Sequence, residues 1–137
     1  MRRIKNIDEY LTEKLFYFEN KIIRVPELIG NKYTPLRILP LSLLEKFKDH
    51  KRLKVFYHKG LNCATENCDK VGKYLIEATE PNGRKHVDLY TEDFELMTVD
   101  HIKPKSKGGT DELVNLQPMC LRCNQKKKDI YKELERR

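Results

Sequence analysis

Four cysteines have the spacing of a metal site. Cys63 and Cys68 are separated by four residues, and Cys120 and Cys123 by two. Two such close pairs, in a chain without a secretory pattern, indicate metal binding before they indicate disulfides. Four thiolates complete the tetrahedral coordination of zinc and leave no open position for chemistry. We therefore predict a structural Zn²⁺ site, the alternative being four unrelated buried thiols.

A second candidate site is the neighbouring pair Asp100 and His101. Histidine has an unperturbed pKa near neutrality and suits the role of a general base. A carboxylate is a hard oxygen ligand of the kind that Mg²⁺ or Mn²⁺ prefers. An isolated Asp-His pair is more often a surface contact or a helix cap, so the interpretation depends on the surrounding residues.

Those surroundings resemble the HNH nuclease family, also known as the His-Me finger or ββα-metal family. The matching residues form a loop motif, an Asn-Leu pair and a cysteine knuckle: Asp100-His101-Ile102-x-Pro104-x-Ser106-x-Gly108-Gly109, then Asn115-Leu116, then Cys120-x2-Cys123-Asn124. The approach to the first knuckle, residues 55–63, is also similar to that family. The resemblance covers about residues 53–129 and not the first fifty residues. It implies an α+β fold with a ββα-metal core stapled by a four-cysteine zinc site.

The resemblance also implies a role for each site residue. His101 is the general base that activates water, and Asn115 orients His101 and shapes the site. Asp100 and Asn124 hold the catalytic metal. Asn124 departs from the family members that have histidine there, and an amide oxygen favours Mg²⁺ or Mn²⁺ over Zn²⁺ or Ni²⁺. The implied reaction is metal-dependent hydrolysis of phosphodiester bonds in DNA, by nicking or by double-strand cutting.

The charge pattern favours an anionic partner, which we expect to be double-stranded DNA. The net charge is +7 and the pI is about 9.2. Residues 86–100 contain no Lys or Arg, whereas residues 101–128 contain seven against two acids. Phosphate contacts position a nucleic acid without reading its sequence. The candidates are the basic residues around the motif, some of which could instead only aid solubility: Lys103, Lys105, Lys107, Arg122, Lys126, Lys127 and Lys128.

The first 52 residues are predicted to be a mainly helical extension, followed by the nuclease core over residues 53–137. Leu11, Leu15 and Phe18 recur at helical spacing behind Asn6 or Asp8 as possible N-caps. A capping box formed by Ser42 and Glu45 predicts a second helix. A third short helix is expected over residues 52–58, with Gly60 after its end.

The core is predicted to begin with a β-hairpin over residues 73–90. Asn82-Gly83 is typical of a two-residue type I′ turn. That loop would pair Ala78 with Val87 and Ile76 with Leu89, so all four apolar residues would share one face. A strand over residues 94–101, a loop, a second strand over residues 113–119 and a helix from Cys120 to about Leu134 complete the expected order.

Two further expectations concern location and activity. The chain has no apolar run of the ~20 residues needed to cross a bilayer, and no signal peptide, so we expect it in the cytoplasm of a bacterial or phage-infected cell. The alternative to an enzyme is a zinc-stabilised DNA-binding module whose HNH site is inactive or needs a partner. A lapsed site would be expected to have lost one of its four motif residues, and none is lost.

Overall fold

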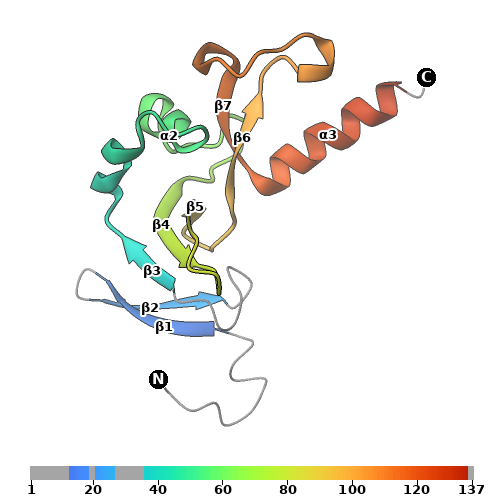
Figure 1. Ribbon diagram of the computed structural model, residues 1–137. Coiled ribbons are helices and arrows are strands. Elements are labelled where there is room, and N and C mark those ends of the chain that lie inside the picture. The colour runs from blue at the N-terminus through green and yellow to red at the C-terminus, as the bar shows by residue number, and fades with distance from the viewer. Residues whose placement is uncertain (1–12, 19–20, 27–35, 136–137) are drawn as a thin grey trace.

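The computed structural model describes residues 13–18, 21–26 and 36–135, with side chains described for residues 36–130 (Figure 1). Strands β1 (Glu13–Phe18) and β2 (Lys21–Pro26) form a separate antiparallel pair. The helix predicted here is therefore wrong for residues 13–18, and its proposed caps Asn6 and Asp8 lie outside the described residues. Aromatic residues make up half of β1 and β-branched residues half of β2, and both kinds favour extended backbone once a partner strand is available.

A three-stranded antiparallel sheet forms the centre of the molecule, with the order β3 (Leu36–Leu39), β4 (Gly72–Thr79), β5 (Lys85–Thr91). Both faces of this sheet are covered by apolar side chains. One face contributes Leu75, Val87 and Leu89 to the main core. The other face holds a smaller cluster around Tyr74 and Ile76. The sheet therefore lies between two apolar layers.

The β4–β5 hairpin forms, but its predicted register is wrong by one residue. Leu75 pairs with Leu89, and Ile76 pairs with Asp88, so Ile76 and Leu89 lie on opposite faces. The loop has three residues: the N–H of Gly83 donates to the carbonyl of Glu80 at 2.8 Å, and the N–H of Glu80 donates to the carbonyl of Arg84 at 2.7 Å. A two-residue loop would need an N–H at Pro81, which proline lacks. Gly83 instead supplies the left-handed residue of the longer turn, at φ +87°.

Two short helices connect β3 to β4. The helix expected from Ser42 is present as a 3-10 helix, η2 (Leu41–Phe47), which follows Pro40 and has no side-chain cap. Helix α2 (Leu53–Lys59) confirms the third predicted helix, and Gly60 follows it at φ +97°. Since β3 packs on β4 and η2 packs on α2 and β4, residues 36–47 contact the core directly. The proposed domain division after residue 52 stays a prediction.

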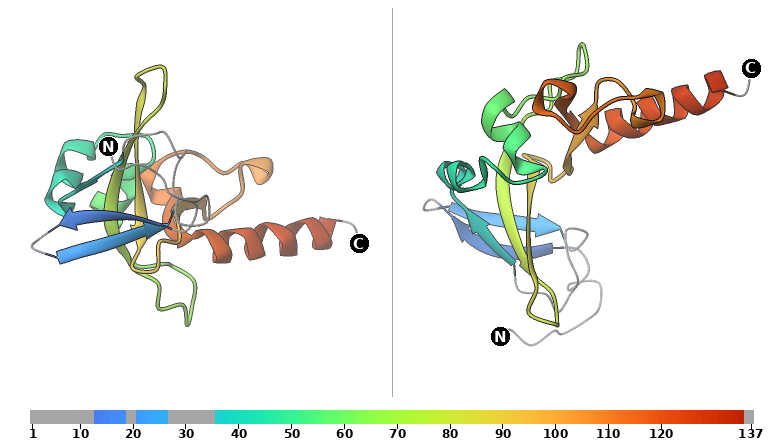
Figure 2. Two further views of the ribbon diagram at one scale, coloured as in Figure 1. Left: turned by 90° about the horizontal axis from the view of Figure 1, so that it is seen from below. Right: turned by 45° about the horizontal axis from the view of Figure 1, so that its top comes forward.

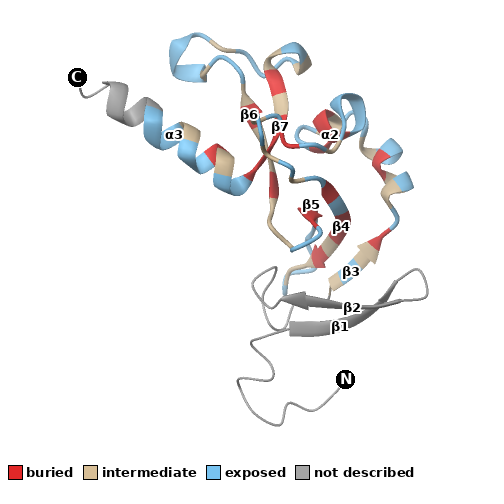
Figure 3. Cartoon of the chain, turned by 180° about the vertical axis from the view of Figure 1, so that it is seen from behind, coloured by how far each residue is buried: buried red, intermediate tan, exposed pale blue. Residues whose placement is uncertain are grey.

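The C-terminal part is a ββα unit. Strands β6 (Met97–His101) and β7 (Leu116–Cys120) pair antiparallel, and α3 (Leu121–Glu135) follows β7 directly. The expected loop between the strands contains two short 3-10 turns, η3 (Lys105–Lys107) and η4 (Leu113–Asn115), so β7 begins later than predicted. Figure 2 shows α3 extending away from the other elements. Buried residues gather on the strands and α2, whereas α3 and the β6–β7 loop are mostly exposed (Figure 3).

The ββα unit and the cysteine cluster together match the expected α+β fold of the ββα-metal type. Among the helices that the structure describes, none is both long and apolar enough to span a lipid bilayer.

Candidate active site and metal centre

The four cysteines converge on one point. Their sulfur atoms all lie within 4.8 Å of one another, and Sγ of Cys68 lies 4.0 Å from Sγ of Cys120. None of the four is in a disulfide. Cys63 and Cys120 are buried, and Cys68 and Cys123 are half-buried. This arrangement can hold one metal ion, as the spacing of the cysteines predicted.

The backbone brings the two knuckles together. The N–H of Ala64 donates to the carbonyl of Pro118 in β7 at 2.8 Å, and the N–H of Cys120 donates to Sγ of Cys63 at 3.3 Å. Burial alone would raise the pKa of Cys63, but the hydrogen bonds from Cys120 and Thr65 outweigh burial and lower this pKa to about 7. Asn67, in the first knuckle, has a left-handed φ of +66°, which asparagine tolerates better than most residues.

His101 ends β6 and is hydrogen-bonded to a residue that the sequence analysis did not single out. Its Nε2 lies 2.7 Å from Oδ1 of Asp111, and Oδ2 of Asp111 accepts from Nζ of Lys105 at 3.0 Å. The hydrogen bond from His101 and then that from Lys105 lower the pKa of Asp111 to about 2. Asp111 is therefore a carboxylate at neutral pH and can only accept, so Nε2 of His101 carries the proton. In the sequence, Asp111 could have been identified by its position in the loop that links His101 to Asn115.

Asp100 points into the protein. It is 7% exposed, and its Oδ2 accepts from Nε2 of Gln117 at 2.9 Å and from Nζ of Lys127 at 2.6 Å. The same Nζ also lies 3.2 Å from the backbone carbonyl oxygen of His101. Asp100 is thus surrounded by β7 and α3, and it holds a cation, the Lys127 ammonium, in this structure.

Asn124 lies in the first turns of α3, opposite β6. It is 6% exposed, and its Nδ2 donates to Oγ1 of Thr98 at 2.8 Å, while Thr98 in turn donates to the carbonyl of Met119 at 2.7 Å. The bond from Nδ2 fixes the orientation of the amide. The amide oxygen accepts no hydrogen bond from the described residues. A carboxylate and an amide oxygen are ligands that Mg²⁺ or Mn²⁺ accepts, with water and substrate oxygens completing the shell. The donor set therefore fits a hard divalent cation.

Asn115 fixes the loop after His101. Within the residues that the structure describes, its side chain forms no hydrogen bond to the side chain of His101. Its Oδ1 accepts from the N–H of Lys103 at 2.8 Å, and its Nδ2 donates to the carbonyls of Lys103 at 3.1 Å and Thr110 at 2.8 Å. The backbone is packed so closely here that a Cβ on Gly109 would lie 1.8 Å from the carbonyl oxygen of Lys103. Asn115 and Gly109 together hold the two ends of the loop that carries Asp111.

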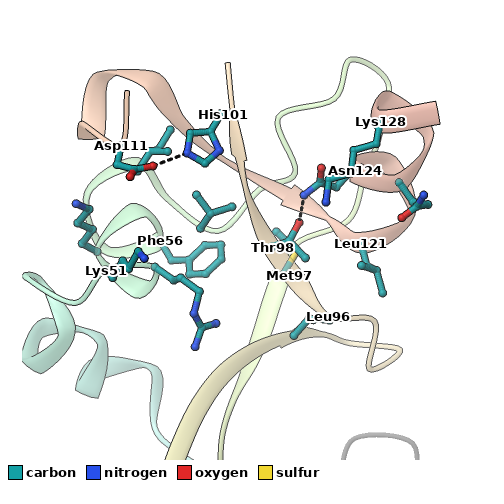
Figure 4. A pocket seen from close by; sticks show the side chains of 15 residues that line it. Lys51, Phe56, Leu96, Met97, Thr98, His101, Asp111, Leu121, Asn124 and Lys128 are labelled. Carbon is teal, nitrogen blue, oxygen red and sulfur yellow. Dashed lines mark hydrogen bonds and ion pairs between the residues drawn. The ribbon is translucent and has the colours of Figure 1, made fainter. Parts of the chain in front are cut away.

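His101, Asp111 and Asn124 line one cavity of about 420 Å³ (Figure 4). The start of α2 forms one wall and α3 forms another, with Phe56 and Met97 among the apolar lining residues. Asp100 is not part of this lining, although it is the neighbour of His101 in β6. His101 and Asn124 therefore line the same cavity, whereas Asp100 lies outside this lining and forms an ion pair with Lys127.

The basic residues chosen from the sequence lie in different places. Lys105 contacts Asp111, and Lys127 contacts Asp100. Arg122 and Lys126 line a second, wider depression of about 790 Å³ beside the cysteines, where Nε of Arg122 lies 3.8 Å from Oε1 of Glu95. Lys128 lines the cavity with His101. The predicted phosphate contacts thus do not form one surface.

Comparison with known proteins finds one family. Residues 83–129 match the model of the family described as HNH endonuclease. The matched residues run from the β4–β5 turn into α3, and they include His101, Asn115 and Asn124 but not the first cysteine knuckle. Among the curated proteins and the solved structures, none matches the chain. The family match indicates nuclease activity on nucleic acid.

Proposed function

We propose that this chain, which carries an HNH endonuclease domain at residues 83–129, is a metal-dependent endonuclease that hydrolyses phosphodiester bonds in double-stranded DNA. The observation that supports this proposal most directly is the hydrogen bond between His101 and Asp111, at the edge of a cavity that also contains Asn124. A histidine whose tautomer is set by a carboxylate is prepared to act as a general base.

The proposed base atom is Nδ1 of His101. The carboxylate of Asp111 keeps the proton of the neutral imidazole on Nε2, so the lone pair of Nδ1 is available to take a proton from the attacking water. As the imidazole becomes positively charged, the nearby carboxylate stabilises that charge, as the acidic partner does in other Asp-His pairs. Asn115 acts on this step indirectly, because it fixes the loop on which Asp111 lies.

Asp100 and Asn124 are the residues that would hold Mg²⁺ or Mn²⁺. When bound, such an ion supplies positive charge for the scissile phosphate and for the leaving oxygen. The burial of Asp100 and the fixed amide of Asn124 would position their ligand oxygens before the ion arrives. We further propose that the metal held by the four cysteines is Zn²⁺ and that this site is structural, because four thiolates suit zinc and leave no open position.

The test is cleavage of supercoiled plasmid by zinc-loaded protein with Mg²⁺, Mn²⁺ or EDTA. We expect nicked or linear product that requires the divalent ion and disappears in the His101→Ala variant. His86→Ala is the matched control, since His86 is an exposed histidine whose Nδ1 lies 3.3 Å from Asp88, away from the cavity lining. Cleavage that survives in His101→Ala would exclude His101 as the base.

One observation favours a second candidate function. The Lys127 ammonium already neutralises Asp100, which is the arrangement expected of an HNH site that binds DNA without cutting or that needs a partner to open. Tight DNA binding with no product in any metal, across a panel of DNA sequences, would support this DNA-binding module instead of the enzyme.

A further inference from the structure

We propose that the cavity beside His101 binds one sugar–phosphate strand of the substrate, with Lys51, Lys54 and Lys128 as its phosphate contacts. This inference rests on the proposed function and adds the path of the strand. None of the three lysines belongs to the HNH motif, and two of them precede the residues that the family model matches.

The three lysines come from two elements that are far apart in the sequence. Lys51 lies in the turn before α2, Lys54 lies in the first turn of α2, and Lys128 lies on α3, yet all three line the same cavity. Figure 4 shows Lys51 and Lys128 on opposite sides of the view, with His101 between them. A phosphodiester strand that contacts both sides would therefore pass the proposed general base.

Charges inside the cavity favour an anion. Among the described residues that line it, Asp111 is the only acidic one; it accepts a hydrogen bond from His101, and its charge is balanced by Lys105. Arg52 is held at 2.6 Å by Asp88. By contrast, within residues 36–130 neither Lys51, Lys54 nor Lys128 makes an ion pair, so their ammonium groups can neutralise phosphates.

The volume of the cavity and its apolar lining residues favour a segment of one DNA strand over a duplex. A volume of about 420 Å³ is in the range of small-molecule pockets, and it is too small for a duplex. Leu96, which is half-buried, and Leu121, which is 47% exposed, also line the cavity. Such side chains pack against a deoxyribose ring or a base face, while the lysines contact the flanking phosphates.

Arg122 and Lys126 form a second basic group, which we compare with Lys51, Lys54 and Lys128. Arg122 and Lys126 line the depression beside the cysteines together with Glu66, Asp69 and Glu95, so acidic groups oppose their charge. Both groups contain exposed basic side chains from α3, but only the first group lies with His101. We therefore expect phosphate binding to depend on Lys51, Lys54 and Lys128 and not on Arg122 and Lys126.

The experiment measures binding of a 30-base-pair DNA by fluorescence anisotropy at several salt concentrations, in the His101→Ala background so that no cleavage occurs. For Lys51→Gln/Lys54→Gln/Lys128→Gln, we expect the affinity for DNA to fall at least about tenfold. The slope of log K against log salt should become less steep by about 3, one unit for each lost phosphate contact. Arg122→Gln/Lys126→Gln is the matched control and should bind within about twofold of the background protein.

Two further readouts make the result decisive. The triple Lys→Arg variant keeps the charges and should restore binding, which separates a phosphate contact from a folding defect. Unchanged affinity and slope in the triple Gln variant, or an equal loss in the control, would overturn the inference. Plasmid cleavage by the protein with His101 intact, together with unimpaired DNA binding by the triple Gln variant, would refute the strand-binding role of the cavity alone. No plasmid cleavage by the protein with its three lysines and His101 intact, together with impaired binding in the triple Gln variant, would refute the proposed activity alone.

Discussion

The ammonium nitrogen of Lys127 lies 2.6 Å from Oδ2 of Asp100 and 3.2 Å from the backbone carbonyl oxygen of His101. These two oxygens belong to the classes that coordinate Mg²⁺ and Mn²⁺. The Asp100 side chain is 9% exposed and the Lys127 side chain 25% exposed, so water screens this pair weakly. Lys127 therefore competes with a divalent ion for the carboxylate that the proposed mechanism needs.

From this competition we predict that Lys127→Met binds Mn²⁺ more tightly than the unchanged protein. Breaking a largely buried ion pair costs on the order of 2 kcal/mol or more, and in the variant the ion no longer has to break it. Since about 1.4 kcal/mol corresponds to tenfold, we expect Mn²⁺ affinity to rise by about tenfold or more. Electron paramagnetic resonance of free Mn²⁺, titrated with zinc-loaded protein, measures this without cleavage.

The matched control is Lys126→Met, because Lys126 is exposed and precedes Lys127 on the same helix. Its Mn²⁺ affinity should not change, and Asp100→Asn should abolish binding. Without added Mn²⁺, the zinc-loaded Lys127→Met protein should also melt at a lower temperature than the unchanged protein, since Asp100 then keeps its burial without its cationic partner. Weaker Mn²⁺ binding in Lys127→Met would show that Lys127 supports the ion site, contrary to the prediction.

Asp111→Asn is expected to reduce the rate of the chemical step while leaving DNA binding intact. An amide can donate to Nε2 and so permits the tautomer in which Nδ1 carries the proton and cannot act as the base. Loss of a partner that orients a catalytic histidine typically costs about 10–100-fold in activity, so we expect that reduction in kcat with little change in KM. Single-turnover cleavage with saturating protein measures it.

Two comparisons make the Asp111 result specific. Asp111→Glu keeps the carboxylate and should recover part of the rate. Lys105→Met removes only the second partner of Asp111 and should have the smaller effect, because the hydrogen bond from His101 is the larger cause of the low Asp111 pKa. Equal rates for the Asn variant and the unchanged protein would mean that Asp111 does not orient His101.

The parts of the fold that the sequence predicted well are those where the signal is local. The cysteine spacing predicted the sulfur cluster, and Gly60 marked the end of α2. The hairpin was recognised from Asn82-Gly83, but its register depended on Pro81, whose missing N–H excludes the shorter loop. One residue of register moves every side chain of a strand to the other face, so a small error in the turn changed the predicted core.

Other features depended on contacts between distant residues. Residues 13–18 have an apolar spacing that suits a helix, yet pairing with residues 21–26 makes them a strand. The role of Asp111 depends on the folded loop, because Asp111 lies ten positions after His101 in the sequence. The same holds for Lys127, which the sequence suggested as a phosphate contact and which the fold places 2.6 Å from Asp100. No local pattern contains that distance.

Asn115→Ala is predicted to loosen the loop between β6 and β7. The substitution removes three side-chain hydrogen bonds, which join Asn115 to the backbone of Lys103 and Thr110. Trypsin provides a direct measurement, since Lys105 and Lys107 lie in this loop, and cleavage after either residue requires the loop to open. We expect faster cutting there and reduced plasmid cleavage with the zinc content unchanged. Loop cutting at the original rate would contradict the assignment of Asn115 as the residue that fixes this loop.

Removal of the metal from the cysteines is predicted to unfold the C-terminal half of the protein. The cluster joins the segment that follows α2 to the beginning of α3, and folding coupled to a structural zinc can be worth on the order of 10 kcal/mol. Circular dichroism melting of protein with one bound zinc, before and after exhaustive chelation, tests this, and readdition of Zn²⁺ serves as the control. Cys123→Ser should reproduce the chelated state, because serine does not supply a thiolate. Retained helical signal and a cooperative transition after chelation would show that the apolar core alone holds β6, β7 and α3 together.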